Sequence, residues 1–317
     1  MQFTTKIPIQ IPKFRDQNPI NYQSNIMALG SCFAENMAQK FQYFKFQNTS
    51  NPFGIIFNPV SIEKLVNRIV NKIEFSEKDI FFHNEQWHCY EVHSELSNPN
   101  KDELLSTLNG LISSTNKQII SSTHIIITFG TSWIYRNIES NEIAANCHKV
   151  PQKKFIKEIL SVEIIHKSIQ NTVELIQKVN PNCNFIFTVS PVRHIKDGFV
   201  ENTLSKSHLI AAVHSQNLQP STYFPSYEIM MDELRDYRFY AKDMLHPNQT
   251  AIDYIWERFS ENYVSDESLK TMEEVDSIQK SLLHLPFNPN SERHQKFTKS
   301  IKHKINALTS NYPRFKF

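Results

Sequence analysis

The feature that most constrains the fold of this chain is an alternation of short apolar runs with longer helix-forming segments. Residues 25–29, 124–129 and 184–189 are almost continuously apolar, which is typical of strands buried on both faces of a sheet. Segments of ten or more residues with helical periodicity separate these runs, and parallel strands need such crossover connections. The pattern therefore predicts an α/β fold with a mainly parallel central sheet and helices on both of its faces.

Short polar segments follow each of these predicted strands. They are residues 30–32 (GSC), 130–132 (GTS) and 190–194 (SPVRH). The carboxyl ends of parallel strands meet at one edge of a sheet, where α/β proteins commonly hold their reactive groups. We therefore expect these three segments to lie together and to contain the functional site.

Two adjacent side chains of the first segment, Ser31 and Cys32, can act as nucleophiles. A helix is predicted over residues 33–42, followed by a short strand over residues 43–47. The free N–H groups at a helix N-terminus lower the pKa of a nearby thiol, and a neighbouring histidine lowers it further. These effects favour Cys32. Adjacent residues at a tight turn point in different directions, however, so Ser31 stays open as the nucleophile.

Asp243 and His246, late in the chain, offer a base for such a nucleophile. A serine or a thiol at neutral pH needs a base, and a carboxylate fixes the tautomer of that base and stabilises its charged form. The three-residue spacing lets the carboxylate of Asp243 fold back onto the imidazole of His246. The alternative is that Asp243 only caps a following helix, with Pro247 as its first residue, and that His246 is a polar surface residue.

Residues 29–34 (LGSCFA), taken with Asp243 and His246, resemble the GSCFA family, which is similar in turn to the SGNH/GDSL hydrolase superfamily. The resemblance covers roughly residues 20–260. It implies a three-layer, flavodoxin-like (SGNH-hydrolase-like) fold and an enzyme that hydrolyses or transfers acyl esters. The superfamily carries its nucleophile as the third residue of a Gly-Asp-Ser motif. That position corresponds to Cys32, with Ser31 in place of the aspartate.

The resemblance also implies an oxyanion hole. Its first two donors would be the N–H groups of Cys32 and of Gly54, the glycine of a second sequence block. In the superfamily the third donor is an asparagine in a Gly-x-Asn block. This chain has the sequence GTS at the corresponding position, residues 130–132, and therefore lacks that asparagine. Either Ser132 donates from the same position or Asn146 reaches in from a predicted hairpin.

Other side chains are candidates for binding a substrate. Arg193 and His194 follow a predicted strand, where a cation can hold a carboxylate or phosphate group; a salt bridge that orients the loop is an equal alternative. His88, His93 and Trp133 are candidates for lining a pocket, although aromatic residues at strand spacing commonly belong to the core. The spacing of the histidines around His88 suits neither a helix face nor a strand face, so we expect no metal site. No cofactor is expected.

The predicted elements divide the chain into a catalytic α/β domain, residues 1–264, and a C-terminal helical extension, residues 265–317. Hairpin insertions are expected near residues 79–96, which are rich in aromatic residues, and near residues 133–146. Residues 1–23 contain three prolines and are expected to form an extended arm.

The charge composition indicates which classes of binding partner are not expected. The 34 basic and 32 acidic residues give a net charge of +2 in a mixed pattern, so neither nucleic acid nor a membrane surface is an expected partner. Residues 1–8 lack the pattern of a secretory leader, and no apolar run reaches the length of a membrane span. The four cysteines have no pairing pattern. We therefore expect a cytoplasmic protein with free thiols.

The function that these features predict is that of an acyl-ester hydrolase or acyltransferase. Its substrate would be a small-molecule or carbohydrate ester, and the resemblance points to an O-acetylated carbohydrate. The alternative is a non-catalytic carbohydrate- or peptide-binding module on a degenerate hydrolase scaffold, which the missing third-block asparagine supports. The sequence leaves open the oligomeric state and the choice between hydrolysis and transfer.

Overall fold

The structure is a computed structural model that describes residues 8–215 and 221–317. The first seven residues of the predicted N-terminal arm lie outside this part of the chain. So does the stretch 216–220 that connects a helix to the last strand of the sheet.

The centre of the fold is a parallel sheet in the order β10-β9-β5-β1-β2. Its strands are β1 (Asn25–Gly30), β2 (Gln47–Ser50), β5 (His124–Phe129), β9 (Asn184–Val189) and β10 (Ser221–Phe224). Counted within this sheet, the order is 2-1-3-4-5, which is the flavodoxin-like arrangement. The predicted fold class is therefore confirmed.

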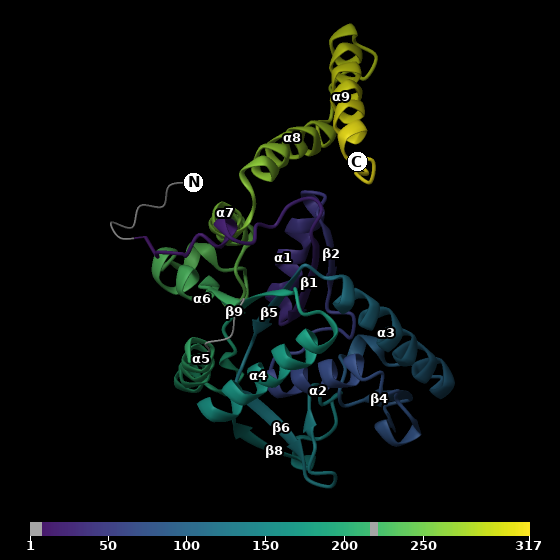
Figure 1. Cartoon of the computed structure of the whole chain (residues 1–317), viewed down its shortest axis with the longest axis vertical. Coiled ribbons are helices and arrows are strands. Elements are labelled where there is room, and N and C mark those ends of the chain that lie inside the picture. The colour runs from purple at the N-terminus through teal and green to yellow at the C-terminus, as the bar shows by residue number, and fades with distance from the viewer. Residues whose placement is uncertain (1–7, 216–220) are drawn as a thin grey trace.

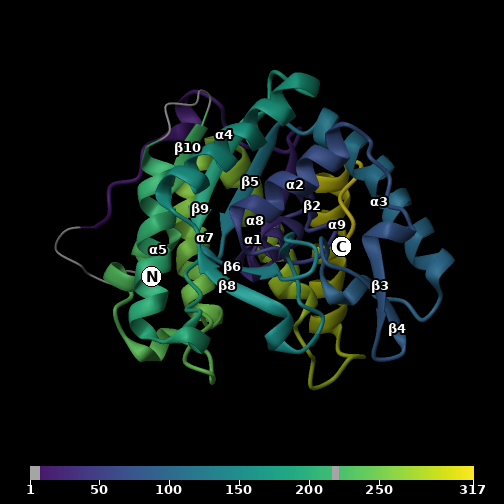
Figure 2. The same cartoon turned by 90° about the horizontal axis from the view of Figure 1, so that it is seen from below.

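Helices cover both faces of the sheet, as Figures 1 and 2 show. One face carries α2 (Pro59–Val70), α3 (Lys101–Ser121), α4 (Val162–Val179) and α5 (Phe199–His214), and the other carries α1 (Cys32–Tyr43) and α7 (Gln249–Tyr263). Successive strand residues point to opposite faces. Ile125 and Ile127 therefore join the first core, and Ile126 joins the second.

Two insertions interrupt the alternation. β3 (Ile80–His83) and β4 (Gln86–Cys89) form an antiparallel hairpin. β6 (Trp133–Asn137), β7 (Ile143–Ala144) and β8 (Phe155–Ile159) form a small antiparallel sheet in the order β7-β6-β8. The expected hairpins are thus present, and β8 adds a strand that the sequence pattern did not predict.

Short elements complete the main domain. α6 (Ser226–Glu228) continues into a single π-helical turn, Ile229–Glu233. Isolated 3-10 turns occupy Phe14–Asp16, Glu77–Asp79, Ser94–Leu96, Gln152–Lys154, Ile195–Asp197 and Tyr237–Phe239.

Two local predictions were wrong. The strand expected over residues 43–47 begins only at Gln47, because α1 extends to Tyr43 and Lys45 adopts a left-handed turn conformation with φ of 67°. The last helix of the main domain begins at Gln249 rather than at Pro247. Its N-cap is Asn248, whose side chain accepts a hydrogen bond from the Ala251 N–H.

The C-terminal residues form two helices that project from the rest of the molecule in Figure 1. They are α8 (Asp266–Leu282) and α9 (Glu292–Asn311). The final turn returns to the main domain, where the Phe315 ring lies 5.0 Å from the buried ring of Tyr22. Among the described residues, no helix combines the length and apolar character needed to cross a membrane.

Candidate active site

The turn between β1 and α1 is fixed by close backbone packing. Gly30 has a φ of 120°, and a Cβ there would lie 2.1 Å from the carbonyl oxygen of Thr128, so only glycine fits. The Gly30 N–H donates to the Asn51 side chain at 2.8 Å, and the Ser31 N–H donates to the Thr128 carbonyl at 3.0 Å. These contacts hold the start of α1 against the carboxyl end of β5.

The two candidate nucleophiles have different surroundings. Ser31 is fully buried and is the N-cap of α1, where its hydroxyl accepts a hydrogen bond from the Phe33 N–H. Cys32 is the first residue of the helix and is partly exposed. The Ser31 hydroxyl is therefore enclosed at the start of the helix, whereas Cys32 is partly open to solvent.

The environment of Cys32 raises the pKa of its thiol. Burial is the largest cause and the nearby carboxylate of Glu35 adds to it, while Lys206 and the N–H groups of Cys32 and Phe33 act in the opposite direction. The helix N-terminus does lower the pKa, as expected, but burial outweighs it. The thiol is thus neutral at pH 7.

Asp243 and His246 form the pair that the sequence predicted. The Asp243 Oδ2 lies 2.6 Å from His246 Nδ1, and its Oδ1 accepts hydrogen bonds from the Leu245 and His246 N–H groups. These N–H groups, followed by the imidazole, lower the pKa of Asp243 to about 2. Asp243 does not cap α7, since Asn248 fills that position. The pair therefore fixes the Nδ1 of His246, and the Nε2 has no hydrogen-bond partner among the described residues.

The loop that holds this pair contacts the carboxyl end of the sheet. The Arg193 N–H, just after β9, donates to the Leu245 carbonyl at 3.3 Å. The neighbouring His194 interacts electrostatically with His246, and Lys206 interacts with both His194 and Cys32. Polar groups from β1, β9 and the Asp243–His246 loop thus gather at one edge of the sheet.

His194 carries the most unusual hydrogen-bonding group of this site. Its Nε2 is buried and has no partner within the described chain, and it lies 3.3 Å from where a Cβ on Gly130 would be. The ring packs edge-on against Phe57, with centroids 5.2 Å apart. Burial, with help from Lys206 and His246, lowers its pKa to about 3. The ring is therefore neutral and has a free nitrogen beside the end of β5.

Lys206, on α5, is a functional candidate that the sequence analysis missed. It is fully buried, and its ammonium donates to the carbonyls of Gly130 at 2.6 Å and Ser190 at 2.8 Å. Burial lowers its pKa to about 7, while Cys32 acts in the opposite direction. The only signal in the sequence is its helical spacing from Asn202 and Leu209, which are both buried.

Two predicted oxyanion donors are already engaged. The Gly54 N–H donates to the Asn51 carbonyl at 2.7 Å. The Ser132 hydroxyl is fully buried and donates to the Ser205 carbonyl at 3.1 Å. Both groups thus have a partner within the protein in this conformation, and their role as oxyanion donors stays a prediction.

Most of the predicted substrate-binding residues serve other contacts. Both ring nitrogens of His88 are hydrogen-bonded, to Ser97 Oγ and to the His83 carbonyl. His93 packs against Gly54, and the Arg193 guanidinium lies over the ring of Tyr240 at 5.2 Å. No cluster of potential metal ligands occurs among the described residues.

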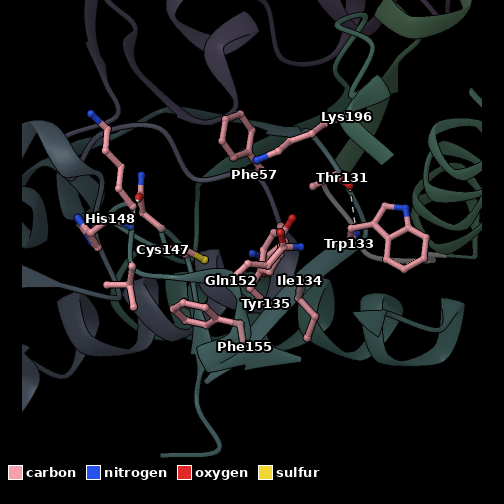
Figure 3. A pocket seen from close by; sticks show the side chains of 16 residues that line it. Phe57, Thr131, Trp133, Ile134, Tyr135, Cys147, His148, Gln152, Phe155 and Lys196 are labelled. Atoms are coloured by element: carbon pink, nitrogen blue, oxygen red, sulfur yellow. Dashed lines mark hydrogen bonds between the residues drawn. The ribbon is translucent and has the colours of Figure 1, made fainter. Parts of the chain in front are cut away.

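A cavity of about 380 Å³ lies beside this edge of the sheet (Figure 3). Trp133 and Asn146, both predicted site residues, line it. Phe57 links it to the site, because it lines the cavity and also contacts His194. The complete lining is Phe57, Asn58, Thr131, Trp133, Ile134, Tyr135, Ala144, Ala145, Asn146, Cys147, His148, Lys149, Val150, Gln152, Phe155 and Lys196.

Comparison with known proteins identifies the family. A model of the GSCFA family matches residues 25–259, and a model of the C-terminal domain of GSCFA domain proteins matches residues 275–317. No curated protein matches the chain. A distant likeness exists to the crystal structure of a carbohydrate esterase family 3 protein from Talaromyces cellulolyticus, with 8% identity, a TM-score of 0.37, and coverage of 80% of this chain and 99% of that one. Since the first model matches most of the chain, the protein belongs to the GSCFA family.

Proposed function

We propose that this protein is an acyl-ester hydrolase or acyltransferase of the SGNH/GDSL type, with Cys32 as its nucleophile. The observation that carries the proposal is the Asp243–His246 pair, in which a carboxylate oxygen lies 2.6 Å from Nδ1 of the imidazole. The pair lies at the same edge of the sheet as the partly exposed thiol of Cys32, the first residue of α1. A nucleophile, a base and a carboxylate that orients the base are the groups that acyl transfer requires.

The proposed reaction has two stages. In the first, Cys32 Sγ bonds to the ester carbonyl carbon while the thiol proton passes to His246 Nε2. The ester C–O bond then breaks, the leaving alcohol takes the proton from His246, and a thioester remains on Cys32. In the second, water or an acceptor alcohol attacks the thioester and the thiol re-forms. The raised pKa of Cys32 supports this order, because a neutral thiol depends on the base.

The oxyanion of the tetrahedral intermediate needs hydrogen-bond donors. The Cys32 N–H is one, at the first turn of α1. The second in our proposal is Nε2 of His194, the unpartnered nitrogen of a neutral imidazole at the end of β5. This nitrogen is buried in the present conformation, so the ring or its neighbour Phe57 must move before it donates to the oxyanion. Lys206 supports the site by holding the carbonyls of Gly130 and Ser190 in place.

The substrate in this proposal is a small acylated molecule, with an O-acylated carbohydrate as the leading candidate. The aromatic residues of the cavity, among them Trp133 and Tyr135, are of the kind that stack on sugar rings. Asn146 lines the same cavity and offers a side-chain amide for a hydroxyl group.

The first test is hydrolysis of p-nitrophenyl acetate by the full chain and by three single variants. We expect Cys32→Ala and His246→Ala each to lower kcat/KM by about a hundredfold or more. Ser31→Ala is the matched control: it loses a helix cap, which costs about 1 kcal/mol of stability, but keeps the nucleophile and most of the activity. Full activity in His246→Ala would reject the proposed base. Loss of activity in Ser31→Ala alone would transfer the nucleophile to Ser31.

A second candidate function is a non-catalytic carbohydrate- or peptide-binding module. Its support is that the Gly54 N–H and the Ser132 hydroxyl are already hydrogen-bonded, as in a scaffold that has lost its oxyanion hole. Under this alternative the natural protein would show no turnover of any ester and no thioester on Cys32 after incubation with an activated ester. Detection of the acylated Cys32 by mass spectrometry would decide for the enzyme.

A further inference from the structure

We propose that the cavity beside the candidate active site binds a hydroxylated organic anion, such as an acidic or phosphorylated sugar, with its negative group on Lys196. The inference deepens the proposed function, since it names the class of molecule to which the ester would belong. Its argument, however, depends on the lining of the cavity and not on the reaction.

The cavity has the size and apolar surface of a small-molecule site. Its volume of about 380 Å³ falls in the range of ligand pockets, which are mainly apolar with a few polar groups. Trp133, Tyr135 and Phe155 supply aromatic surface from the small antiparallel sheet, and Phe57 supplies it from the side of the candidate active site. A ring of sugar size therefore has flat surfaces on which to pack.

The charge of the lining has one sign. Lys149 and Lys196 line the cavity, and no aspartate or glutamate is among its lining residues in the described part of the chain. Figure 3 shows the Lys196 side chain among those that line the cavity. Its charge also lowers the pKa of the Cys147 thiol, against the larger effect of burial. A carboxylate or phosphate is the group that compensates such cations.

Lys149 and Lys196 differ from neighbouring lysines in that they form no ion pair within the described part of the chain. Lys157 pairs with Asp197 and Lys154 pairs with Glu139, so their charges are balanced within the protein. The positive charges that line the cavity are therefore not balanced by an acidic side chain in the described part of the chain.

His148, another lining residue, has a neutral imidazole. Its Nε2 lies 2.7 Å from the Cys89 carbonyl and must carry the proton, because a carbonyl can only accept. Its Nδ1 is consequently a lone pair, and it is buried with no partner within the described chain. Burial lowers the pKa of this imidazole to about 4, so the lone pair persists at neutral pH. His148 therefore adds no charge to the lining, and its buried Nδ1 is closed to a ligand in this conformation.

The test compares three probes that share a ring and a nitrophenyl group and contain no ester of a carboxylic acid. They are p-nitrophenyl β-glucuronide, p-nitrophenyl β-glucoside 6-phosphate and the neutral p-nitrophenyl β-glucoside, titrated calorimetrically into the full chain. We expect at least one anionic probe to bind about tenfold or more tightly than the neutral probe. The stronger of the two anions identifies the carboxylate or the phosphate as the natural group.

Variants make the assignment specific. Lys196→Gln removes one cation from an exposed position and should abolish most of the preference for the anion while leaving binding of the neutral probe unchanged. Lys153→Gln is the matched control, since Lys153 is exposed in the same region but does not line the cavity. Equal affinity for all three probes, no binding of any probe at millimolar concentration, or no effect of Lys196→Gln would overturn the inference.

The same titration in Cys32→Ala separates this inference from the proposed function. If the enzyme proposal holds, Cys32→Ala loses turnover and keeps the preference for the anion. If the natural protein binds the anionic probes but hydrolyses no ester, the proposed reaction fails and the anion site stands.

Discussion

Single residues at the candidate active site are shifted toward their neutral forms by burial. The pKa of the Cys32 thiol is raised, that of His194 falls to about 3 and that of Lys206 falls to about 7. Desolvation is the first cause in each case, because a buried charge loses its hydration. Cys32 and His194 are therefore neutral at pH 7 and Lys206 is partly charged, while Asp243 remains ionised. The negative charge created by the proposed thiol attack would meet Lys206 and the N–H groups of α1.

The buried histidines predict that acid destabilises the fold. His148 titrates at about 4 in the folded protein against 6.5 as its ordinary value. Between these two pH values the unfolded chain binds more protons than the folded one, so the free energy of unfolding must fall as the pH drops from about 6.5 to about 4. Each pKa unit of difference corresponds to about 1.4 kcal/mol.

Urea unfolding of the natural protein and of His148→Gln at pH 7 and pH 4.5 measures this effect. Glutamine keeps an amide donor for the Cys89 carbonyl and has no titratable ring. The variant should therefore lose less stability between the two pH values than the natural protein does. An equal loss in both proteins would show that His148 is not the buried neutral group described above.

At the scale of secondary-structure elements, the turn from β1 into α1 depends on one glycine. We expect Gly30→Ala to destabilise the protein by about 3 kcal/mol or more, since an alanine at φ of 120° is strained and its Cβ would meet the Thr128 carbonyl at 2.1 Å. Gly110→Ala is the control. It lies in the interior of α3 with nothing within 4 Å of an added Cβ, and there alanine should stabilise the helix by about 0.5–1 kcal/mol.

Thermal unfolding of both variants provides the measurement. The two substitutions are chemically identical, so any difference between them comes from the local backbone. A Gly30→Ala protein as stable as Gly110→Ala would mean that the turn does not have the conformation that positions Cys32.

At the scale of the whole molecule, the C-terminal residues complete the second hydrophobic core. The Phe315 ring is only 5% exposed, stacks on Tyr312 at 4.7 Å and meets Tyr22 at 5.0 Å. Phe315→Ala should therefore lower the free energy of unfolding by about 3–5 kcal/mol, the usual cost of removing a buried phenylalanine side chain.

Phe287→Ala is the matched control for that change. Phe287 lies between α8 and α9 and is fully exposed, so its removal should leave the midpoint of urea unfolding unchanged. If Phe315→Ala also left the midpoint unchanged, the C-terminal turn would not be part of the folded core.

The sequence by itself determined the elements whose patterns are local. The runs 124–129 and 184–189 became β5 and β9, and the periodic segment between them became α4, because continuous apolar runs and a 3.6-residue period each reflect one element's own burial. The Asp243–His246 contact was predictable for the same reason, since its partners are three residues apart.

Only the tertiary structure decided which groups remain free for chemistry. The Ser132 hydroxyl is engaged by a carbonyl 73 positions away, and the Lys206 ammonium by one 76 positions away. Burial reversed the expected shift of the Cys32 pKa, and the sheet brought an unpartnered His194 nitrogen to the end of β5. Hydrogen-bond satisfaction and desolvation depend on neighbours from distant parts of the chain, and no local pattern of residues encodes which neighbours these are.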